Sequence, residues 1–580
     1  MKTNNFTFKA GGEAGTGIAT MGEMFAKIGQ RNGLFAFMEN EYPSLIRGGH
    51  NTITVRVSDE KIWALHGKVD ILVALDKRSI EEHYEEMEER GVVVYDSEKV
   101  KGEEIKIKRK DIRFFPVPLS KIAHEAGGEI YFNQAAMGAI IAILGVEPQV
   151  LYELIGETFG KKGEEVIEKN MEAARKGFEF VKSIQKTPFD IEIKPRKNGK
   201  TLFLNGNDAV CIGAMKAGVK LIAEYPMSPS SSILHWMAAH AVKYDIVVKH
   251  TEDEIAAINY LLGAGFAGVR AMTATSGGGF SLMTEALGNG GIAEIPCVIV
   301  NVQRAGPSTG IPTYTEQGDL QFMLHASQGE FPRILCMPGD VEEAFYETFN
   351  VFNMAELVQT PAIMLLDKYL GESSQVVEYF DMKAMHVKRG KLLSDEQMEG
   401  AKNFKRHKLT KSGISPRCLP GQRNGIYVAS SYEHDETGYT DESGENRIAQ
   451  INKRARKMKS INPNLYQPAF YGNAKSTFLL VSWGSTKGVV LEAMKLLEKE
   501  NISIRFMHIK YASPFASDTI KQALQAASKA MICECNSEGQ MRNLIREKTG
   551  ILIENKYLKY DARPFEAEDI VKEVKKLIGK

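Results

Sequence analysis

The sequence has no excess of basic residues and no apolar run of membrane length. Lys plus Arg and Asp plus Glu each total 73 among 580 residues, so the formal net charge is zero. A dedicated nucleic-acid-binding protein normally shows a basic excess, and we therefore expect no nucleic-acid partner. The longest apolar stretch, roughly residues 135–146, is far shorter than the ~20 residues that cross a bilayer, and we expect no membrane partner.

Cysteines are also few. The six cysteines are too sparse for a disulfide framework, and they contain no Cys-x-x-Cys motif; the one close pair is Cys533 and Cys535. An iron–sulfur cluster needs about four converging thiolates, so we expect any cluster on another chain. We expect no metal ligands in this chain itself. Residues 1–6 lack the charged and apolar segments of a signal peptide, which predicts a cytoplasmic protein.

The composition, 43% hydrophobic and 25% charged, is that of a globular protein with several cores. Apolar strand-like runs alternate with helical periodicity, which favours α/β domains, the first of them with a mostly parallel sheet. At ~150 residues per domain the length alone suggests about four domains. The pattern predicts three α/β domains and a connector, with boundaries at 1–190, 198–370, 371–472 (the connector) and 473–580.

The connector carries dense charge. Six acidic residues lie between Glu433 and Glu445, and five of the seven residues from Lys453 to Lys459 are basic. Such runs are usually solvated surface, which is our prediction here, with docking to a partner as the alternative.

A glycine turn follows the first predicted strand and opens a helix. Backbone N–H groups in such a turn can hold an anionic group, and Gly12, Gly15 and Gly17 are its candidate residues. Their order differs from the Gly-x-Gly-x-x-Gly of dinucleotide-binding folds, so three readings stay open: a nicotinamide site, a site for another phosphate-bearing ligand, and a purely structural turn. A second cluster sets Arg47 beside two glycines, and it could bind a phosphate or simply make a structural turn.

The second predicted domain has four polar segments, and the last two directly follow apolar strands. They begin at Tyr225, Thr251, Ser276 and Arg304. Because open α/β sheets bind ligands beyond the carboxyl ends of their strands, several such loops in one domain predict a binding site. Helix capping by the hydroxyls and acidic residues of these loops is the structural alternative.

At this point the motifs resemble a known family, the alpha subunits of 2-oxoacid:ferredoxin oxidoreductases, in the form with a gamma domain fused ahead of alpha that is typical of 2-oxoglutarate enzymes. The resemblance covers nearly the whole chain and rests on the order of its motifs. These are Gly11-Gly-Glu-Ala-Gly-Thr-Gly, Ser44-Leu-Ile-Arg-Gly-Gly, Tyr225-Pro-Met-Ser-Pro-Ser, Glu252-Asp-Glu-Ile-Ala-Ala, Thr275-Ser-Gly-Gly-Gly, Gln303-Arg-Ala-Gly-Pro-Ser-Thr-Gly, Pro312-Thr-Tyr-Thr-Glu-Gln-Gly-Asp-Leu, Ser415-Pro-Arg-Cys-Leu-Pro-Gly and Glu534-Cys-Asn-Ser-Glu-Gly-Gln.

The resemblance implies a fold and a reaction. The three α/β domains would be a gamma-type domain, a pyrimidine-type thiamine-diphosphate domain and a transketolase-C-terminal-like domain. The enzyme would decarboxylate a 2-oxoacid on thiamine diphosphate, reduce ferredoxin and transfer the acyl group to coenzyme A. 2-Oxoglutarate is the favoured substrate. A broad-range enzyme and one for branched-chain or aryl 2-oxoacids are the alternatives, and a nicotinamide-dependent dehydrogenase is a further one.

The resemblance also implies roles for residues of the second domain. Glu254 matches the glutamate that activates the cofactor through its aminopyrimidine, and Ser228 stands where the family usually has threonine. Arg304 matches an arginine that clamps the substrate carboxylate. The remaining implied positions are Tyr225, Pro226, Ser276 and Gly277 against the cofactor, and Gly12, Gly15, Gly17 and Arg47 near coenzyme A.

One half of the cofactor site is missing from the sequence. A diphosphate site needs Mg²⁺ held by Asp and Asn oxygens, and no Gly-Asp-Gly followed by Asn at the family spacing is present; Gly339-Asp340-Val does not fit. We therefore expect a beta subunit to supply the Mg²⁺ site and at least one 4Fe–4S cluster. The expected partners are this beta subunit, ferredoxin and a second copy of the chain.

Overall fold

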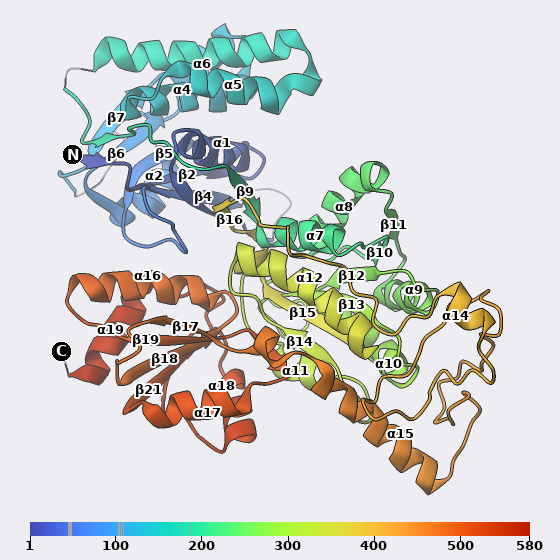
Figure 1. Cartoon of the computed structure of the whole chain (residues 1–580). Coiled ribbons are helices and arrows are strands. Elements are labelled where there is room, and N and C mark those ends of the chain that lie inside the picture. Colours follow the sequence, from blue (N-terminus) through green and yellow to red (C-terminus); the bar gives the residue numbers. More distant parts are fainter. Residues whose placement is uncertain (45–48, 103–104, 106, 108, 186, 580) are drawn as a thin grey trace. The chain divides into compact units, whose positions relative to one another are not determined.

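The chain forms two compact units in a computed structural model (Figure 1), which describes residues 1–44, 49–102, 105, 107, 109–185 and 187–579. Unit 1 comprises Met1–Leu204, Ser373–Tyr379 and Glu566–Glu568, and unit 2 comprises the rest of the described chain. Both units therefore have the α/β fold that the alternation of strands and helices predicts.

Unit 1 is built on an eight-stranded sheet with the order β7-β6-β5-β2-β4-β3-β16-β9, and a separate parallel pair, β1 with β8. Its elements are β1 (Lys2–Thr3), β2 (Phe6–Glu13), α1 (Ile18–Arg31), β3 (Phe35–Glu41), β4 (His50–Ser58), β5 (Val69–Ala74), α2 (Lys77–His83), β6 (Met87–Asp96), β7 (Arg113–Val117), α3 (Leu119–Glu125), α4 (Phe132–Leu144), α5 (Pro148–Phe159), α6 (Glu164–Ile184), β8 (Ile191–Glu192), β9 (Thr201–Asn205) and β16 (Ser374–Glu378).

Only half of this sheet is parallel. Strands β7, β6, β5 and β2 run parallel, as the sequence predicts, whereas β2–β4, β4–β3 and β3–β16 are antiparallel pairs. The connection from β3 to β4 spans only residues 42–49. A parallel crossover needs a dozen or more residues, so this short connection forces the antiparallel arrangement.

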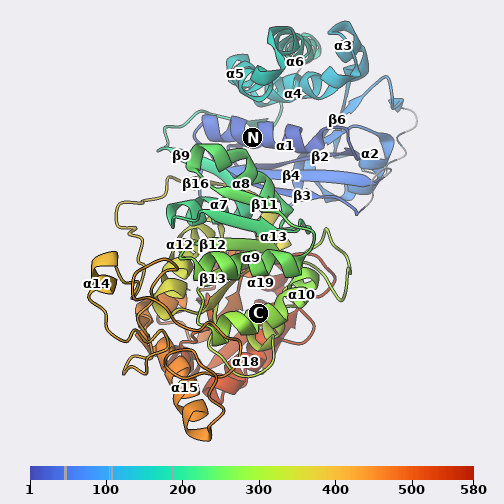
Figure 2. The same cartoon turned by 90° about the vertical axis from the view of Figure 1, so that its right-hand side faces the viewer.

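The apolar run noted in the sequence is α4, a 13-residue helix whose side chains are almost all buried. Figure 2 shows α4, α5 and α6 stacked beyond α1, which itself packs on β3 and β4. Glycines let α4 and α6 approach closely: a Cβ on Gly138 would lie 1.9 Å from the carbonyl oxygen of Ala174. Among the described helices, none is both long enough and apolar enough to cross a membrane.

Unit 2 contains two further sheets. Its elements are α7 (Gly206–Lys216), β10 (Leu221–Glu224), α8 (Ser231–Tyr244), β11 (Val247–His250), α9 (Glu254–Phe266), β12 (Ala271–Thr275), α10 (Gly277–Ile292), β13 (Cys297–Gln303), α11 (Leu320–His325), β14 (Ile334–Cys336), α12 (Val341–Val358), β15 (Pro361–Asp367), α13 (Lys368–Glu372), α14 (Asp395–Glu399), α15 (Gly444–Arg456), β17 (Ala469–Gly472), β18 (Phe478–Trp483), α16 (Thr486–Lys499), β19 (Arg505–Ile509), β20 (Tyr511–Ser513), α17 (Ser517–Ala526), β21 (Lys529–Glu534), α18 (Gln540–Thr549), β22 (Asn555–Leu558) and α19 (Ala567–Ile578).

The seven-stranded sheet has the order β11-β10-β12-β13-β15-β14-β20, and all its pairs are parallel except β14–β20. Strands β13 and β15 are buried along their whole length, as expected for central strands covered by helices on both faces. Helices α9 and α10 contribute to one apolar core with β12 and β13. The chain leaves β10 and β12 in opposite directions along the sheet, so the switch point of this fold lies between these two strands.

The five-stranded sheet, with the order β17-β19-β18-β21-β22, shares a core with the first: Leu479 and Val481 of β18 belong to the same buried cluster as Ile299 of β13. An ionic contact ties the two together. The Lys487 ammonium lies 2.5 Å from the Asp340 carboxylate and 2.6 Å from that of Glu343.

The charged connector differs from the sequence prediction. Lys453 and Lys457 are fully buried, and both ammonium groups contact the carboxylate of Glu294, which is itself inaccessible to solvent. His407 Nδ1 lies 3.2 Å from the same carboxylate. The prediction of a solvated surface is therefore wrong for these lysines: α15 lies against the domain, and the basic residues on its inner face are paired rather than exposed.

Candidate functional site

Four loops meet at the carboxyl edge of the seven-stranded sheet. They follow β11, β10, β12 and β13, which are consecutive neighbours in the sheet and all parallel. These loops carry Glu254, Tyr225, Ser276 and Arg304, so the fold places the candidate residues of the second predicted domain at one edge.

Glu254 is the first residue of α9, and its side chain is 3% exposed. The neighbouring residue, Asp253, caps α9, because its carboxylate accepts a hydrogen bond from the Ala256 N–H at 2.8 Å. Glu254 Oε1, in contrast, has no hydrogen-bond partner among the described residues. Burial raises the pKa of Glu254. A buried carboxyl with a free oxygen and a raised pKa is suited to exchange a proton with a ligand.

The space in front of Glu254 depends on Gly279 of α10. A Cβ at Gly279 would lie 2.4 Å from Glu254 Oε1 and 2.2 Å from Thr275 Oγ1, closer than atoms can approach. The glycine-rich start of α10 therefore leaves room for the carboxyl group, which explains the Ser-Gly-Gly-Gly sequence in packing terms.

Arg304 and Ser228 lie together. The Arg304 guanidinium donates a hydrogen bond from Nη1 to the Ser228 carbonyl oxygen at 2.8 Å, while its buried Nε has no partner among the described residues. Burial lowers the pKa of Arg304, although a guanidinium keeps its charge at neutral pH. Arg304 thus fixes the loop that carries the Ser228 hydroxyl and still offers an unpaired donor.

Tyr225 and Pro226 open that loop. The Tyr225 ring is partly exposed, with its centroid 6.3 Å from that of His250 at the end of β11, and Pro226 is half-buried. The alternative of helix capping receives no support here: the Ser230 hydroxyl donates to the Met227 carbonyl oxygen at 2.7 Å and makes no cap bond to α8.

Ser276 and Gly277 begin α10. The Ser276 hydroxyl is buried and has no partner in the described part of the chain. A Cβ at Gly277 would lie 2.5 Å from Asp319 Oδ2, and Asn301 donates to that oxygen at 3.0 Å. Burial raises the pKa of Asp319. The sequence analysis gave Asp319 no role, although Asp319 stands in the quoted motif that begins at Pro312, and it did not single out Asn301.

Glu224 was missed as well. It ends β10, directly before Tyr225, is fully buried, and neither of its carboxyl oxygens has a hydrogen-bond partner among the described residues. Burial raises the pKa of Glu224 well above its ordinary value. The sequence did carry a signal, since an acidic residue that closes a four-residue apolar strand is unusual.

The Gly339-Asp340 segment, which the sequence analysis weighed for the diphosphate, has other contacts. Asp340, the one candidate named in the sequence, caps α12 through a bond to the Glu343 N–H at 2.8 Å and pairs with Lys487. In the part of unit 2 that the structure describes, His, Cys, Asp and Glu side chains form no cluster with cation-binding spacing.

Unit 1 has a cavity of about 600 Å³ beside the glycine turn. Gly15 and Gly17, both in the left-handed backbone region, line it, whereas Gly12 lies within β2 against Leu75. Arg47 falls outside the described residues. The charged groups of the lining are Lys99 and the carboxylates of Glu13, Asp76 and Glu129.

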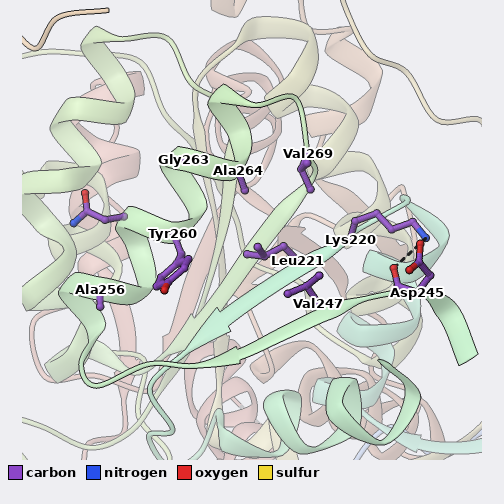
Figure 3. A pocket seen from close by; sticks show the side chains of 10 residues that line it. Lys220, Leu221, Asp245, Val247, Ala256, Tyr260, Gly263, Ala264 and Val269 are labelled. Atoms are coloured by element: carbon purple, nitrogen blue, oxygen red, sulfur yellow. Dashed lines mark hydrogen bonds and ion pairs between the residues drawn. The ribbon is translucent and has the colours of Figure 1, made fainter. Parts of the chain in front are cut away.

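An apolar groove of about 750 Å³ lies between α9 and the sheet edge. Figure 3 shows Tyr260 of α9 and Leu221 and Val247 of strands β10 and β11 around the same space. Tyr260 is 45% and Val247 is 60% exposed. The groove runs from the amino ends of β10 and β11 along α9 as far as Ala256, two residues from Glu254.

Comparisons with known proteins match nearly the whole chain to one family. A family model described as "Pyruvate flavodoxin/ferredoxin oxidoreductase, thiamine diP-bdg" matches residues 212–453, and one described as "Pyruvate ferredoxin/flavodoxin oxidoreductase" matches residues 7–180. A 2-oxoacid:ferredoxin oxidoreductase subunit alpha of Sulfolobus sp is 31% identical over 98% of this chain and 96% of its own length. Another, from Aeropyrum pernix, is 32% identical over 98% and 97%.

A solved structure is similar throughout. It is the 2-oxoglutarate:ferredoxin oxidoreductase from Magnetococcus marinus with 2-oxoglutarate, coenzyme A and succinyl-CoA bound. Its sequence is 32% identical, the two chains cover each other completely, and the TM-score is 0.92. The likeness therefore includes the sequence and the fold of both units.

Proposed function

This chain belongs to the 2-oxoacid:ferredoxin oxidoreductase family as an alpha subunit, and we propose that it converts 2-oxoglutarate and coenzyme A to succinyl-CoA and CO₂ together with a separate beta chain. Two electrons from each oxidation pass to ferredoxin. The proposed division is a gamma-type domain at 1–190, a pyrimidine-type domain at 198–370, the connector at 371–472 and a transketolase-C-terminal-like domain at 473–580. The observation that carries the proposal is the buried Glu254 carboxyl with its unpaired oxygen.

The residues at the carboxyl edge fit one end of thiamine diphosphate. In the proposal Glu254 Oε1 bonds the aminopyrimidine, and Tyr225, Pro226, Ser276 and Gly277 surround it. When bound, this cofactor supplies a nucleophilic carbon and the electron sink for decarboxylation. The chain's own contribution is a proton held at Glu254 Oε1, which the raised pKa of that carboxyl favours.

The beta chain supplies what this edge lacks. The sequence lacks both the Gly-Asp-Gly…Asn pattern of a diphosphate site and a converging set of cysteines, so the diphosphate, its Mg²⁺ and at least one 4Fe–4S cluster are assigned to the partner. We place the partner in the α9 groove, because a chain seated there lies along the helix that begins with Glu254 and covers apolar side chains that are otherwise exposed. A second copy of this chain completes the proposed assembly.

Replacing Val247 by Asp in the groove is expected to weaken binding of the beta chain by about 10-fold or more, because the interface would bury an unpaired charge. Val247 is exposed, so the variant should fold normally. The measurement is co-purification of the two chains, followed by analytical ultracentrifugation. The matched control is Tyr560→Asp, also at an exposed position. Equal association of both variants with the beta chain would contradict the placement.

Substrate binding is assigned to Ser228 and Arg304. The Ser228 hydroxyl is exposed at the edge, and Arg304 keeps an unpaired Nε beside it. In the proposal these groups bind the carboxylate and 2-oxo oxygen of the 2-oxoacid.

Arg304→Lys should lower kcat/KM for the 2-oxoacid by about 10–100-fold, mainly through KM, because one hydrogen bond to a charged group contributes ~1.5–3 kcal/mol. Lysine keeps the charge but has no planar fork. Steady-state kinetics of the reconstituted complex provide the measurement, with the exposed Arg423→Lys as the control. An unchanged KM would remove Arg304 from the substrate site.

We also propose that coenzyme A lies near the glycine turn of unit 1, with Gly12, Gly15, Gly17 and Arg47 as the proximal residues. Because three carboxylates and one lysine line the cavity, it suits the uncharged pantetheine arm better than the phosphates.

The deciding experiment is anaerobic reconstitution. The chain is co-expressed with the beta subunit from its own organism, and viologen reduction is followed with coenzyme A and a panel of 2-oxoacids. We expect turnover only with both chains and the highest kcat/KM with 2-oxoglutarate. A higher kcat/KM with branched-chain or aryl 2-oxoacids would show that these are the substrates instead. Similar kcat/KM values across the panel would indicate a broad-range enzyme. Full activity from this chain alone would overturn the half-site proposal.

A further inference from the structure

Two histidines of unit 1 face each other beside strand β2, which leads into the glycine turn. His50 is the first residue of β4 and His83 is the last residue of α2, and their Nε2 atoms are 2.9 Å apart. Both side chains are largely buried. The pair thus joins a strand and a helix from separate parts of the chain.

A carboxylate stands beside the pair. Glu82 Oε2 is 3.7 Å from His50 Nε2, and the three potential ligand atoms of His50, Glu82 and His83 all lie within 4.8 Å of one another. Arg78 holds the other oxygen of Glu82 at 2.6 Å, so the carboxylate is oriented and Oε2 faces the histidines.

We propose that His50, His83 and Glu82 bind a divalent transition-metal ion, although the sequence had led us to expect no metal ligands in this chain. Two imidazoles and one carboxylate form a donor set that suits Zn²⁺, Co²⁺, Ni²⁺ or Fe²⁺. With metal–nitrogen bonds of about 2.0–2.1 Å, nitrogens 2.9 Å apart subtend about 90° at the metal, the angle of two neighbouring ligands in a facial arrangement.

The surroundings favour this role. His83 Nδ1 lies 2.8 Å from Glu86 Oε1, and Lys9 holds the other Glu86 oxygen at 2.5 Å. Lys9 thereby orients the Glu86 carboxylate toward His83. An ionised Glu86 accepts the Nδ1 proton of His83, which leaves the Nε2 lone pair free for a metal.

His50 is also suited to act as a ligand. Its side chain is largely buried, and its Nε2 faces both His83 Nε2 and Glu82 Oε2. A plain hydrogen bond between the imidazoles would explain the 2.9 Å contact too. Such a hydrogen bond would need no carboxylate beside Nε2, and a pair joined in this way would bind no metal. A metal-binding measurement therefore distinguishes the hydrogen bond from the metal site.

The test uses the full-length chain, stripped with a chelator and titrated with Co²⁺ and, separately, Zn²⁺. We expect one saturable site per chain, a Co²⁺ absorption spectrum with nitrogen ligands, and two imidazole scatterers in Zn²⁺ X-ray absorption. His83→Gln and the exposed Glu82→Gln should abolish the site, and Glu86→Gln should weaken it about 10–100-fold. His124→Gln, an exposed histidine of the same unit, should bind as the wild type does.

Two results would overturn the proposal. One is a wild-type chain that binds neither ion more tightly than about 1 mM. The other is a site that survives in both His83→Gln and Glu82→Gln, because the metal would then be bound elsewhere. Circular dichroism of each variant excludes misfolding as the cause of a loss, and Glu82→Gln alone decides the question if His83→Gln fails to fold.

Discussion

Glu254→Gln should lower the turnover of the reconstituted enzyme by about 10²–10⁴-fold, the range for loss of a positioned acid–base group. The amide has nearly the same shape, so Gly279 still accommodates it and α9 keeps its Asp253 cap. What disappears is an oxygen at Oε1 that can take up and release a proton. The expected split is a large fall in kcat with little change in the affinity for the beta chain.

Glu252→Gln provides the matched control for this prediction. It lies in the same loop, two residues away, but its side chain is exposed and makes no contact on which the proposal depends. We expect that variant to retain nearly full activity. If Glu254→Gln turned over as fast as Glu252→Gln, unit 2 would be a support for a partner enzyme rather than part of its active site.

Glu294→Gln should cost about 3–5 kcal/mol of folding stability, the penalty for removing one member of a buried ion cluster. The substitution leaves the ammonium groups of Lys453 and Lys457 without a negative partner in a site closed to solvent. Burial acts to raise the pKa of Glu294, but the two lysines hold it well below its ordinary value, so the native carboxylate is charged. Urea denaturation and hydrogen exchange in α15 measure the effect.

Two further variants sharpen this test. A triple variant, Glu294→Leu with Lys453→Met and Lys457→Met, removes the whole cluster and should recover most of the loss, because buried ion pairs contribute little net stability over apolar groups of similar size. Glu547→Gln breaks an exposed pair with Lys548 and should change stability by less than about 1 kcal/mol. A Glu294→Gln variant no less stable than Glu547→Gln would show that the lysines do not depend on Glu294.

The sequence predicted local structure and the position of the loops well, because both depend on nearby residues. Strands β12 (Ala271–Thr275) and β18 (Phe478–Trp483) are apolar runs bounded by polar turns, and such runs have few alternatives to a buried strand. The alternation of strands and helices also placed Glu254 and Arg304 at the same sheet edge. This rule holds for any parallel sheet and needs no contact information.

Contacts between residues far apart in the chain could not be predicted from the sequence. The burial of Lys453 depends on Glu294, which is far away in the chain, and local charge density points the other way. The pairing of β20 with β14 joins two predicted domains through strands too short to recognise. Glu224 was overlooked because its position after a short apolar run is only a weak signal, and its complete burial is visible only in the structure.

The pairing of β16 with β3 has a consequence for how the protein is made. Ser374 pairs with Met38, so unit 1 receives a strand that the ribosome delivers only after most of the following domain has been synthesised. At ~5–20 residues per second, the first 204 residues wait roughly 10–35 s for that strand. During this interval the edge of β3 is open to pairing with other nascent chains, which makes chaperone protection in the cell most valuable at this stage.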